Sequence, residues 1–333
     1  MIKISYTIGL STIQDLGRDE NYRHGVSIGG AMDRLALQMG NALLGNAKTA
    51  AAIEVTLFPI KFEILSSVNI AVTGADCAIE LDGKQINPNW AFHAEKGQTL
   101  SLSKLNSGSF AYVHLAGGID VPEVLGSRST YLRCAFGGLD GRMLQNGDVI
   151  KSLPEADPFP PIAPGGFGAI SPALALPQPS HASVGTNDAI TMLRYLPAAE
   201  HDYFDKASLD ALVTAPWQIT PQSSRAGYRL AGPNLAMTDK LEMRSHGIVP
   251  GVIQVPPGGA PIIQTADSQT SGGYPKIGTV IDADMWRLAQ TRIGNQICFQ
   301  KTSYEEALAA YREMNKFIDK VRALSKAYRD LLK

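Results

Sequence analysis

Short apolar runs of strand length recur between residues 61 and 150, and turn sequences stand among them. The runs cover residues 62–64, 68–72, 78–81, 99–102 and 110–115. The turns are Leu-Asp-Gly-Lys at 81–84, Glu-Lys-Gly-Gln at 95–98 and Asn-Gly-Asp at 146–148. Glycine beside Asp, Asn or Lys favours tight hairpin turns. Strands spaced this closely, with almost no helical periodicity, predict a β-barrel or a β-sandwich.

The C-terminal half carries a hairpin signal. Residues 251–255 and 260–266 are apolar runs separated by Pro-Pro-Gly-Gly, which can continue neither strand. Further strands are predicted at 2–10, 52–57, 189–196 and 296–300. Within the second of these, Glu54 alternates with apolar neighbours, so it is either exposed or lines a cleft. The fold class predicted is mainly β with a few helices, comprising two β-barrel-like domains and a long C-terminal helix.

Three helices are predicted. Asp33 is placed to cap the first, and Gly45 to end it. Residues 201–213 form the second. Ser303 and Glu306 have the spacing of a capping box before a long periodic apolar stripe, which predicts the terminal helix.

Eight prolines fall between residues 154 and 179, a density that excludes regular helix and sheet interiors. We therefore predict an N-terminal β-rich domain at 1–153, a proline-rich linker at 154–180 and a C-terminal barrel domain with the terminal helix at 181–333.

Composition narrows the classes of partner. The 30 Lys and Arg residues balance 31 Asp and Glu residues, so bulk charge recruits neither nucleic acid nor an anionic membrane. Three scattered cysteines fit neither a disulfide framework nor a zinc site, and the six histidines lack metal-ligand spacing. The N-terminus has no apolar signal region and no apolar run could span a bilayer, so we expect a cytoplasmic protein without a metal site.

A polar loop follows the second run of the hairpin. It reads Asp-Ser-Gln-Thr-Ser-Gly-Gly-Tyr-Pro from Asp267 to Pro275, and its uncharged donors and acceptors suit an amide, a urea or a carboxylate. An ordinary turn of a β protein is the alternative. Earlier in the chain, Arg225 and Arg229 flank Gly227 and Tyr228, and guanidinium groups bind carboxylates and phosphates in bidentate fashion.

Several of these segments match one family. They are Ile253-Gln254-Val255-Pro256-Pro257, Asp267-x-Gln269-Thr270-x-Gly272-Gly273-Tyr274-Pro275, Arg225-x-Gly227-Tyr228-Arg229-Leu230, and Thr12-x-Gln14-Asp15-x-Gly17-Arg18. The chain thereby resembles the KipA family, also called allophanate hydrolase subunit 2-like or biotin-dependent carboxyltransferase-like proteins. Within it, the pattern is most similar to the C subunits of bacterial 5-oxoprolinases. One departure is Asp19-Glu20-Asn21, where family members usually have a glycine.

The resemblance implies a cyclophilin-like C-terminal barrel. It also implies a protein that is active only as part of a heteromer, which contains a KipI-like B subunit and an A subunit. That complex would hydrolyse 5-oxo-L-proline to L-glutamate with ATP and Mg²⁺. The sequence has no G-x-x-x-x-G-K-[ST] loop, so we expect the complex, rather than such a loop here, to hold the nucleotide.

Motif position suggests roles for individual residues. An arginine could hold the substrate carboxylate or a developing phosphate charge, and Gln254, Gln269 or Thr270 could hydrogen-bond the lactam. His246 could act as an acid or base, although a single histidine is more often structural. The catalytic candidates are His246, Asp267 and Gln269. The substrate-binding candidates are Arg225, Tyr228, Arg229, Gln254, Thr270, Gly272, Gly273 and Tyr274. The secondary candidates are Gln14, Asp15 and Arg18, with an Asp15–Arg18 salt bridge as the structural alternative.

Two other functions fit the same family. The chain could be the carboxyltransferase component of a biotin-dependent urea or amide carboxylase, which would need a separate biotinylated carrier because no Met-Lys dipeptide occurs here. It could instead be a KipA-type regulator without enzymatic activity that binds a KipI-like kinase inhibitor.

Overall fold

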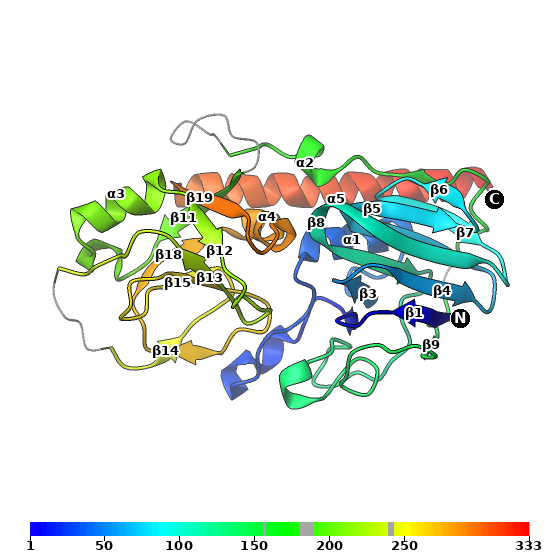
Figure 1. The fold of residues 1–333 in the computed structure, drawn as a ribbon. Helices are drawn as coiled ribbons and strands as arrows, with labels where there is room; N and C mark the ends of the chain where they lie inside the picture. Colours follow the sequence, from blue (N-terminus) through cyan, green and yellow to red (C-terminus); the bar gives the residue numbers. More distant parts are fainter. Residues whose placement is uncertain (156–157, 180–189, 239–242, 333) are drawn as a thin grey trace. The chain divides into compact units, whose positions relative to one another are not determined.

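The computed structural model describes residues 1–155, 158–179, 190–238 and 243–332 (Figure 1). It confirms the mainly β fold class and the long C-terminal helix. By internal contacts the chain forms two compact units, one of residues 1–18, 29–176 and 314–333, and one of residues 19–28 and 177–313. These units differ from the predicted domains because residues 154–176 and the end of the last helix pack with the first unit, whereas residues 19–28 pack with the second.

The first unit is built on a ten-stranded sheet with the order β10-β7-β5-β8-β4-β1-β9, in which β3 also pairs with β8 and with β2, and β6 pairs with β5. The strands are β1 (Ile2–Thr7), β2 (Thr12–Gln14), β3 (Ala52–Val55), β4 (Ile60–Ile64), β5 (Val68–Leu81), β6 (Lys84–Ile86), β7 (Trp90–Ala94), β8 (Thr99–Leu115), β9 (Val149–Ile150) and β10 (Phe167–Gly168).

Two of these strands are longer than predicted. The runs at 68–72 and 78–81 are one strand, β5, and the runs at 99–102 and 110–115 are one strand, β8. The register between β5 and β8 shifts at three places after Gly74, which adopts a φ of 95°. Bulges of this kind bend a strand without ending it, so the polar residues between the apolar runs stay within the sheet.

Helix α1 (Arg34–Leu43) packs against this sheet, and its ends follow the predicted signals. The Asp33 carboxylate accepts a hydrogen bond from the Ala36 N–H at 2.8 Å. Gly45, with a φ of 69°, follows the last turn. The capping prediction for Asp33 is therefore confirmed. The unit also contains the 3₁₀ turn η2 (Leu132–Cys134) and helix α2 (Pro172–Ala175).

A buried polar network lies between α1 and the sheet. Glu54 is 1% exposed, and its carboxylate accepts hydrogen bonds from the Tyr112 hydroxyl at 2.7 Å and the Met32 N–H at 2.9 Å. His114 is fully buried between Thr73 and Asn41. Of the two positions predicted for Glu54, an exposed one is wrong, because its carboxylate is enclosed and accepts from Tyr112 of β8 and from the backbone of Met32, which precedes α1.

The second unit is a closed barrel with the order β11-β18-β15-β16-β13-β12-β19, and its strands are labelled in Figure 1 except for β16. The strands are β11 (Ile190–Pro197), β12 (Trp217–Ile219), β13 (Gly227–Ala231), β15 (Val252–Gln254), β16 (Ile262–Gln264), β18 (Lys276–Val280) and β19 (Gln296–Lys301). The predicted hairpin is present, since β15 and β16 pair with Ile253 opposite Ile263. Position 189, where a strand was predicted to start, lies outside the described residues.

Outside the barrel, β14 (His246–Gly247) pairs with β17 (Ser271–Gly272). The helical elements of this unit are η1 (Asp19–His24), η3 (His201–Tyr203), α3 (Lys206–Thr214), η4 (Asp282–Asp284) and α4 (Met285–Gln290). The helix predicted at 201–213 is thus two elements. Asp205 causes the break, because it caps α3 by accepting from the Ser208 N–H at 2.7 Å.

Helix α5 (Tyr304–Leu332) begins with the predicted capping box. The Ser303 N–H donates to Glu306 at 3.0 Å, and the Glu306 N–H donates to the Ser303 hydroxyl at 3.2 Å. Its later turns pack on the first unit, where the Ser325 hydroxyl donates to the Leu43 carbonyl at 2.6 Å. The terminal helix therefore does not belong to the barrel alone.

Candidate functional site

The polar loop, residues 267–275, connects β16 to β18 and contains β17. The side chains of Gln269, Ser271 and Tyr274 are exposed, while Ser268 is buried. The loop is therefore a surface feature whose backbone is partly enclosed, and the contacts at its two ends define how it is held.

Arg225 fixes the start of the loop. Its guanidinium group donates to the Asp267 carboxylate from Nε at 2.9 Å and from Nη2 at 3.1 Å. The Asp267 N–H returns a bond to the Arg225 carbonyl at 2.8 Å. The two side chains are 19% and 12% exposed, so the pair is shielded from water without being fully buried. The structure thus brings together one substrate-binding candidate and one catalytic candidate.

Lys276 fixes the end of the loop. Its Nζ lies 2.9 Å from Glu200 Oε2, and its backbone N–H donates to the same oxygen at 3.1 Å. Nζ also hydrogen-bonds His246 Nε2, while His246 Nδ1 lies 3.0 Å from the Arg244 carbonyl oxygen. His246 is therefore part of a cluster with a lysine and a glutamate, rather than an isolated histidine beside the loop.

Gln254 lies beneath the glycine pair. It is 4% exposed, its amide nitrogen donates to the Tyr274 carbonyl at 3.4 Å, and its amide oxygen accepts from Gln264 at 3.1 Å. A Cβ atom at Gly272 would come within 2.6 Å of the Gln254 amide nitrogen. A side chain at 272 would therefore displace the end of the Gln254 side chain, and neither Gly272 nor Gly273 has a positive φ.

A segment from the start of the chain holds the middle of the loop. We call residues 19–28 the strap. The Tyr22 hydroxyl donates to the Thr270 carbonyl at 3.0 Å, and the Ser27 hydroxyl donates to the Ser268 carbonyl at 2.7 Å. Burial raises the pKa of Tyr22, so its hydroxyl remains a donor at neutral pH. The side chains of the strap therefore hold the backbone of the loop and leave the side chain of Gln269 exposed.

The remaining predicted site residues lie elsewhere in the two units. Tyr228 is buried at 5% exposure opposite Ile263, and Arg229, next along β13, is exposed. Alternation along a strand sends these two side chains to opposite faces. Tyr228 therefore packs with the barrel core, whereas Arg229 is accessible to a ligand.

The secondary candidates belong to the first unit. The Asp15 carboxylate accepts from the hydroxyls of Ser127 at 2.6 Å and Ser129 at 2.5 Å. The buried Arg18 donates from Nη2 to the Ser129 carbonyl at 2.6 Å, and its guanidinium group lies over the Phe136 ring. Gln14 donates to the Thr130 carbonyl at 3.2 Å. All three side chains join β2 and its following turn to residues 127–136.

Sequence reasoning missed Glu200, Lys276, Tyr22 and Ser27. Lys276 directly follows the matched motif and could have been included on that ground. Glu200 and the two strap residues carry no local signal, because their contacts with the loop region span 76, 248 and 241 positions of the chain.

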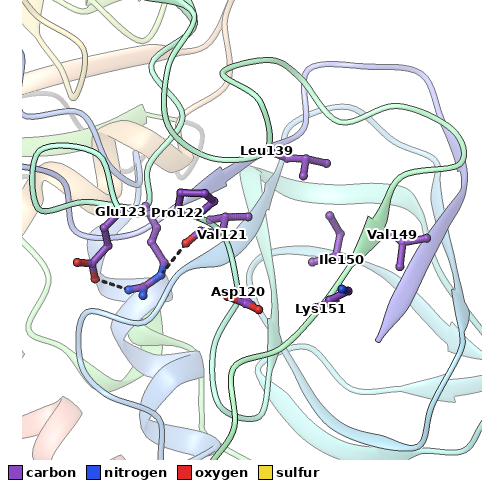
Figure 2. A pocket seen from close by; sticks show the side chains of 9 residues that line it. Asp120, Val121, Pro122, Glu123, Leu139, Val149, Ile150 and Lys151 are labelled. Carbon is purple, nitrogen blue, oxygen red and sulfur yellow. Dashed lines mark hydrogen bonds and ion pairs between the residues drawn. The ribbon is translucent and has the colours of Figure 1, made fainter.

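A cavity of about 570 Å³ lies in the first unit (Figure 2). Glu123 and Pro122 line one side of it, and Leu139, Val149 and Ile150 line the other. Arg128 also lines the cavity and pairs with Glu123 at 2.5 Å. Among the residues whose structure is described, no group of three His, Cys, Asp or Glu side chains is placed to hold a metal ion. In that same part of the chain, no helix combines the length and apolarity needed to cross a membrane.

The sequence of the barrel and its polar loop matches a known protein family. Residues 24–301 match the family model described as "Carboxyltransferase domain, subdomain A and B". The chain belongs to this carboxyltransferase-domain family, which confirms the resemblance seen in its motifs.

Individual proteins are similar to this chain over most of its length. The chain is 38% identical over 323 residues to the C subunit of 5-oxoprolinase from Escherichia coli, covering 96% of this chain and 97% of that protein. It is 38% identical over 324 residues to the C subunit of 5-oxoprolinase from Haemophilus influenzae, covering 97% and 98%. The crystal structure of Kluyveromyces lactis urea carboxylase superposes with a TM-score of 0.84 at 28% identity, over 96% of this chain and 29% of that one.

Proposed function

We propose that this chain is the C subunit of a multi-subunit 5-oxoprolinase that hydrolyses 5-oxo-L-proline to L-glutamate with ATP. The observation that carries the proposal is the 38% identity, over nearly the full length of both chains, to two proteins that bear this name. The name of those relatives implies other subunits. We propose that the A and B subunits of the enzyme are the partners and that the B subunit is KipI-like.

The polar loop suits this substrate. 5-Oxo-L-proline is a small lactam with one carboxylate, so a site for it needs amide donors and acceptors together with a cation. The exposed Gln269 amide and the exposed Arg229 guanidinium group offer these functions. Arg225 is paired with Asp267, so in this proposal it shapes the loop, and Arg229 is the arginine assigned to the substrate carboxylate.

ATP and Mg²⁺ are assigned to the assembled complex. The sequence lacks a G-x-x-x-x-G-K-[ST] loop, the motif whose backbone N–H groups most often cradle nucleotide phosphates. The described residues therefore do not fit a P-loop nucleotide site, and no chemical step of this chain is derived through ATP.

The proposal is tested by co-purifying the chain with the A subunit of the enzyme and a KipI-like protein, and then assaying ATP-dependent release of glutamate from 5-oxoproline. Arg229→Ala should raise KM by roughly 10-fold or more, because it removes a bond to a charged group worth about 1.5–3 kcal/mol. Gln269→Ala should lower kcat/KM by roughly 2- to 10-fold, because a bond between neutral groups is worth about 0.5–1.5 kcal/mol. Arg225→Ala should also lower kcat/KM, through the loop. Full turnover by all three variants would remove the site from the proposal, whereas a stable complex without any turnover would favour the KipA-type regulator.

One observation favours a second candidate function. The chain superposes on urea carboxylase over 96% of its length, and its family model is a carboxyltransferase domain. In that case the polar loop would accept urea or another amide, and a biotinylated partner would supply the carboxyl group. If the complex carboxylates an amide and avidin blocks that reaction, this second function is established and 5-oxoproline hydrolysis is not the function.

A further inference from the structure

Three charged or titratable side chains from separate segments meet beside the polar loop. Lys276 begins β18, Glu200 precedes η3, and His246 lies in β14. The side chains of Lys276 and Glu200 are only 14% and 12% exposed. An ammonium group this shielded from water is normally held by a carboxylate, but here it also contacts an imidazole nitrogen.

The hydrogen-bond partners fix which atom of the cluster donates. A carbonyl oxygen can only accept, so His246 Nδ1, 3.0 Å from the Arg244 carbonyl, carries the proton of the neutral ring. The tautomer is assigned from this network. His246 Nε2 then has a free lone pair and accepts from Lys276 Nζ. One proton of the ammonium group thus lies between the amine nitrogen and the imidazole nitrogen.

Glu200 positions the lysine. One oxygen of its carboxylate accepts from both the backbone N–H of Lys276, at 3.1 Å, and the side-chain Nζ, at 2.9 Å. These two bonds restrict where the long side chain can lie, and they offset the charge of the ammonium group. The imidazole of His246 is a second acceptor for the ammonium group besides the carboxylate.

The cluster adjoins the polar loop and Gln254, which the family motifs mark as substrate-binding candidates. His246 is paired with Gly272 across β14 and β17, and Lys276 is paired with Gln254 across β15 and β18. The Gln254 amide in turn contacts the Tyr274 carbonyl. The cluster and the glycine pair of the polar loop are therefore parts of one local structure.

We propose that Lys276 and His246 form a proton-transfer pair that opens the lactam ring, with Glu200 as the positioning residue. The inference rests on the proposed function. In the step, the oxygen of a water molecule bonds to the carbonyl carbon and the C–N bond of the ring breaks. The electron pair of that bond stays on the nitrogen, which takes a proton from Lys276 Nζ. The proton that the water loses passes to His246 Nε2 and on to Nζ, so the pair ends as it began.

Substitutions at Lys276 in the reconstituted complex separate this role from a structural one. Lys276→Met should lower kcat by about 100-fold or more while KM changes little, the scale expected for loss of a general acid. Lys276→Arg retains the positive charge but cannot give up a proton near neutral pH, so it should lose a comparable share of kcat. Glu200→Gln should lower kcat by roughly 10-fold, since it weakens positioning only.

Chemical rescue provides the readout that a structural ion pair would not give. Added methylamine or ethylamine should restore turnover to Lys276→Ala in proportion to amine concentration, and guanidine should not. Lys3→Ala, which removes a lysine from a Lys–Glu pair in the first unit, is the matched control and should keep full activity. Complex formation and melting temperature are recorded for every variant, so that rates refer to folded complex.

The outcomes distinguish the two proposals. If the wild-type complex hydrolyses 5-oxoproline and Lys276→Met keeps its kcat within about threefold, the proton-transfer pair is wrong and the proposed function stands. If Lys276→Arg restores full kcat, Lys276 supplies charge only, and the inference is again overturned. If the wild-type complex shows no turnover of 5-oxoproline, both proposals fall together.

Discussion

The two compact units each contain a set of polar side chains held by hydrogen bonds, and the two sets differ in exposure. In the first unit, Glu54, Tyr112 and His114 are 0–1% exposed. In the second, Asp267 and Lys276 are 12% and 14% exposed, and the loop between them also presents Gln269 to solvent. Complete enclosure suits a network that stabilises the fold, whereas partial enclosure leaves donors and acceptors that a ligand can reach. The comparison predicts that changes in the first set alter stability and that changes in the second alter activity.

The largest expected effect on stability concerns His114 and pH. Burial lowers the pKa of His114 from 6.5 to about 3, so the folded protein keeps this ring neutral while the unfolded chain protonates it below pH 6.5. Because the unfolded state then binds the extra proton, stability falls as the pH falls from 6.5 towards 3. At pH 5 the loss is about 2 kcal/mol, from 1.36 kcal/mol per pH unit. Urea denaturation of the whole protein at pH 5, 6 and 7 measures this loss of stability.

His114→Gln is the control for this prediction, because glutamine can still bond Thr73 and Asn41 but does not titrate. The variant should be less stable at pH 7, and its stability should change little between pH 7 and pH 5. Equal pH dependence in the wild type and the variant would mean that other groups cause the loss of stability. The buried network of the first unit would then not control stability in the way the comparison predicts.

A smaller effect is expected for the ion pair at the start of the polar loop. Asp267→Asn keeps the shape of the side chain and removes its charge, and it should cost about 1–2 kcal/mol, between the values for exposed and fully buried pairs. A double-mutant cycle with Arg225→Met isolates the interaction energy by urea denaturation. A coupling above about 4 kcal/mol would place this pair with the fully buried network and contradict the comparison.

Signals that act over a few residues predicted the fold correctly. Asp33 caps α1 and Ser303 pairs with Glu306 at the start of α5 because caps depend on neighbours three positions away. The hairpin of β15 and β16 follows from Pro256 to Gly259. The long strands β5 and β8 were not predicted, because bulges keep polar residues within the sheet and hide its continuity from the pattern.

The site was less accessible to sequence reasoning. Family motifs located the polar loop, and alternation along β13 explains why Arg229 is exposed and Tyr228 buried. Alternation failed for Glu54, because its enclosure depends on Tyr112 and Met32, which lie 58 and 22 positions away in the sequence. The partner of Lys276, Glu200, lies 76 positions away, and only the closed barrel brings the two together.

The smallest expected effect concerns the strap. Tyr22→Phe removes the hydroxyl that holds the Thr270 carbonyl, and that carbonyl still accepts from the Ile248 N–H at 3.1 Å. The cost should therefore be about 0.5–1.5 kcal/mol, the net value of one hydrogen bond, and confined to the strap and loop. Hydrogen exchange followed by mass spectrometry should show faster exchange in residues 19–28 and 267–275 with unchanged rates in the barrel strands. Tyr6→Phe, at an exposed tyrosine of β1, is the matched control. If exchange in the loop does not change, the Tyr22 hydroxyl does not hold the loop, and the enclosure that separates the loop from an ordinary surface turn must come from its other contacts, including Ser27, Arg225 and Lys276.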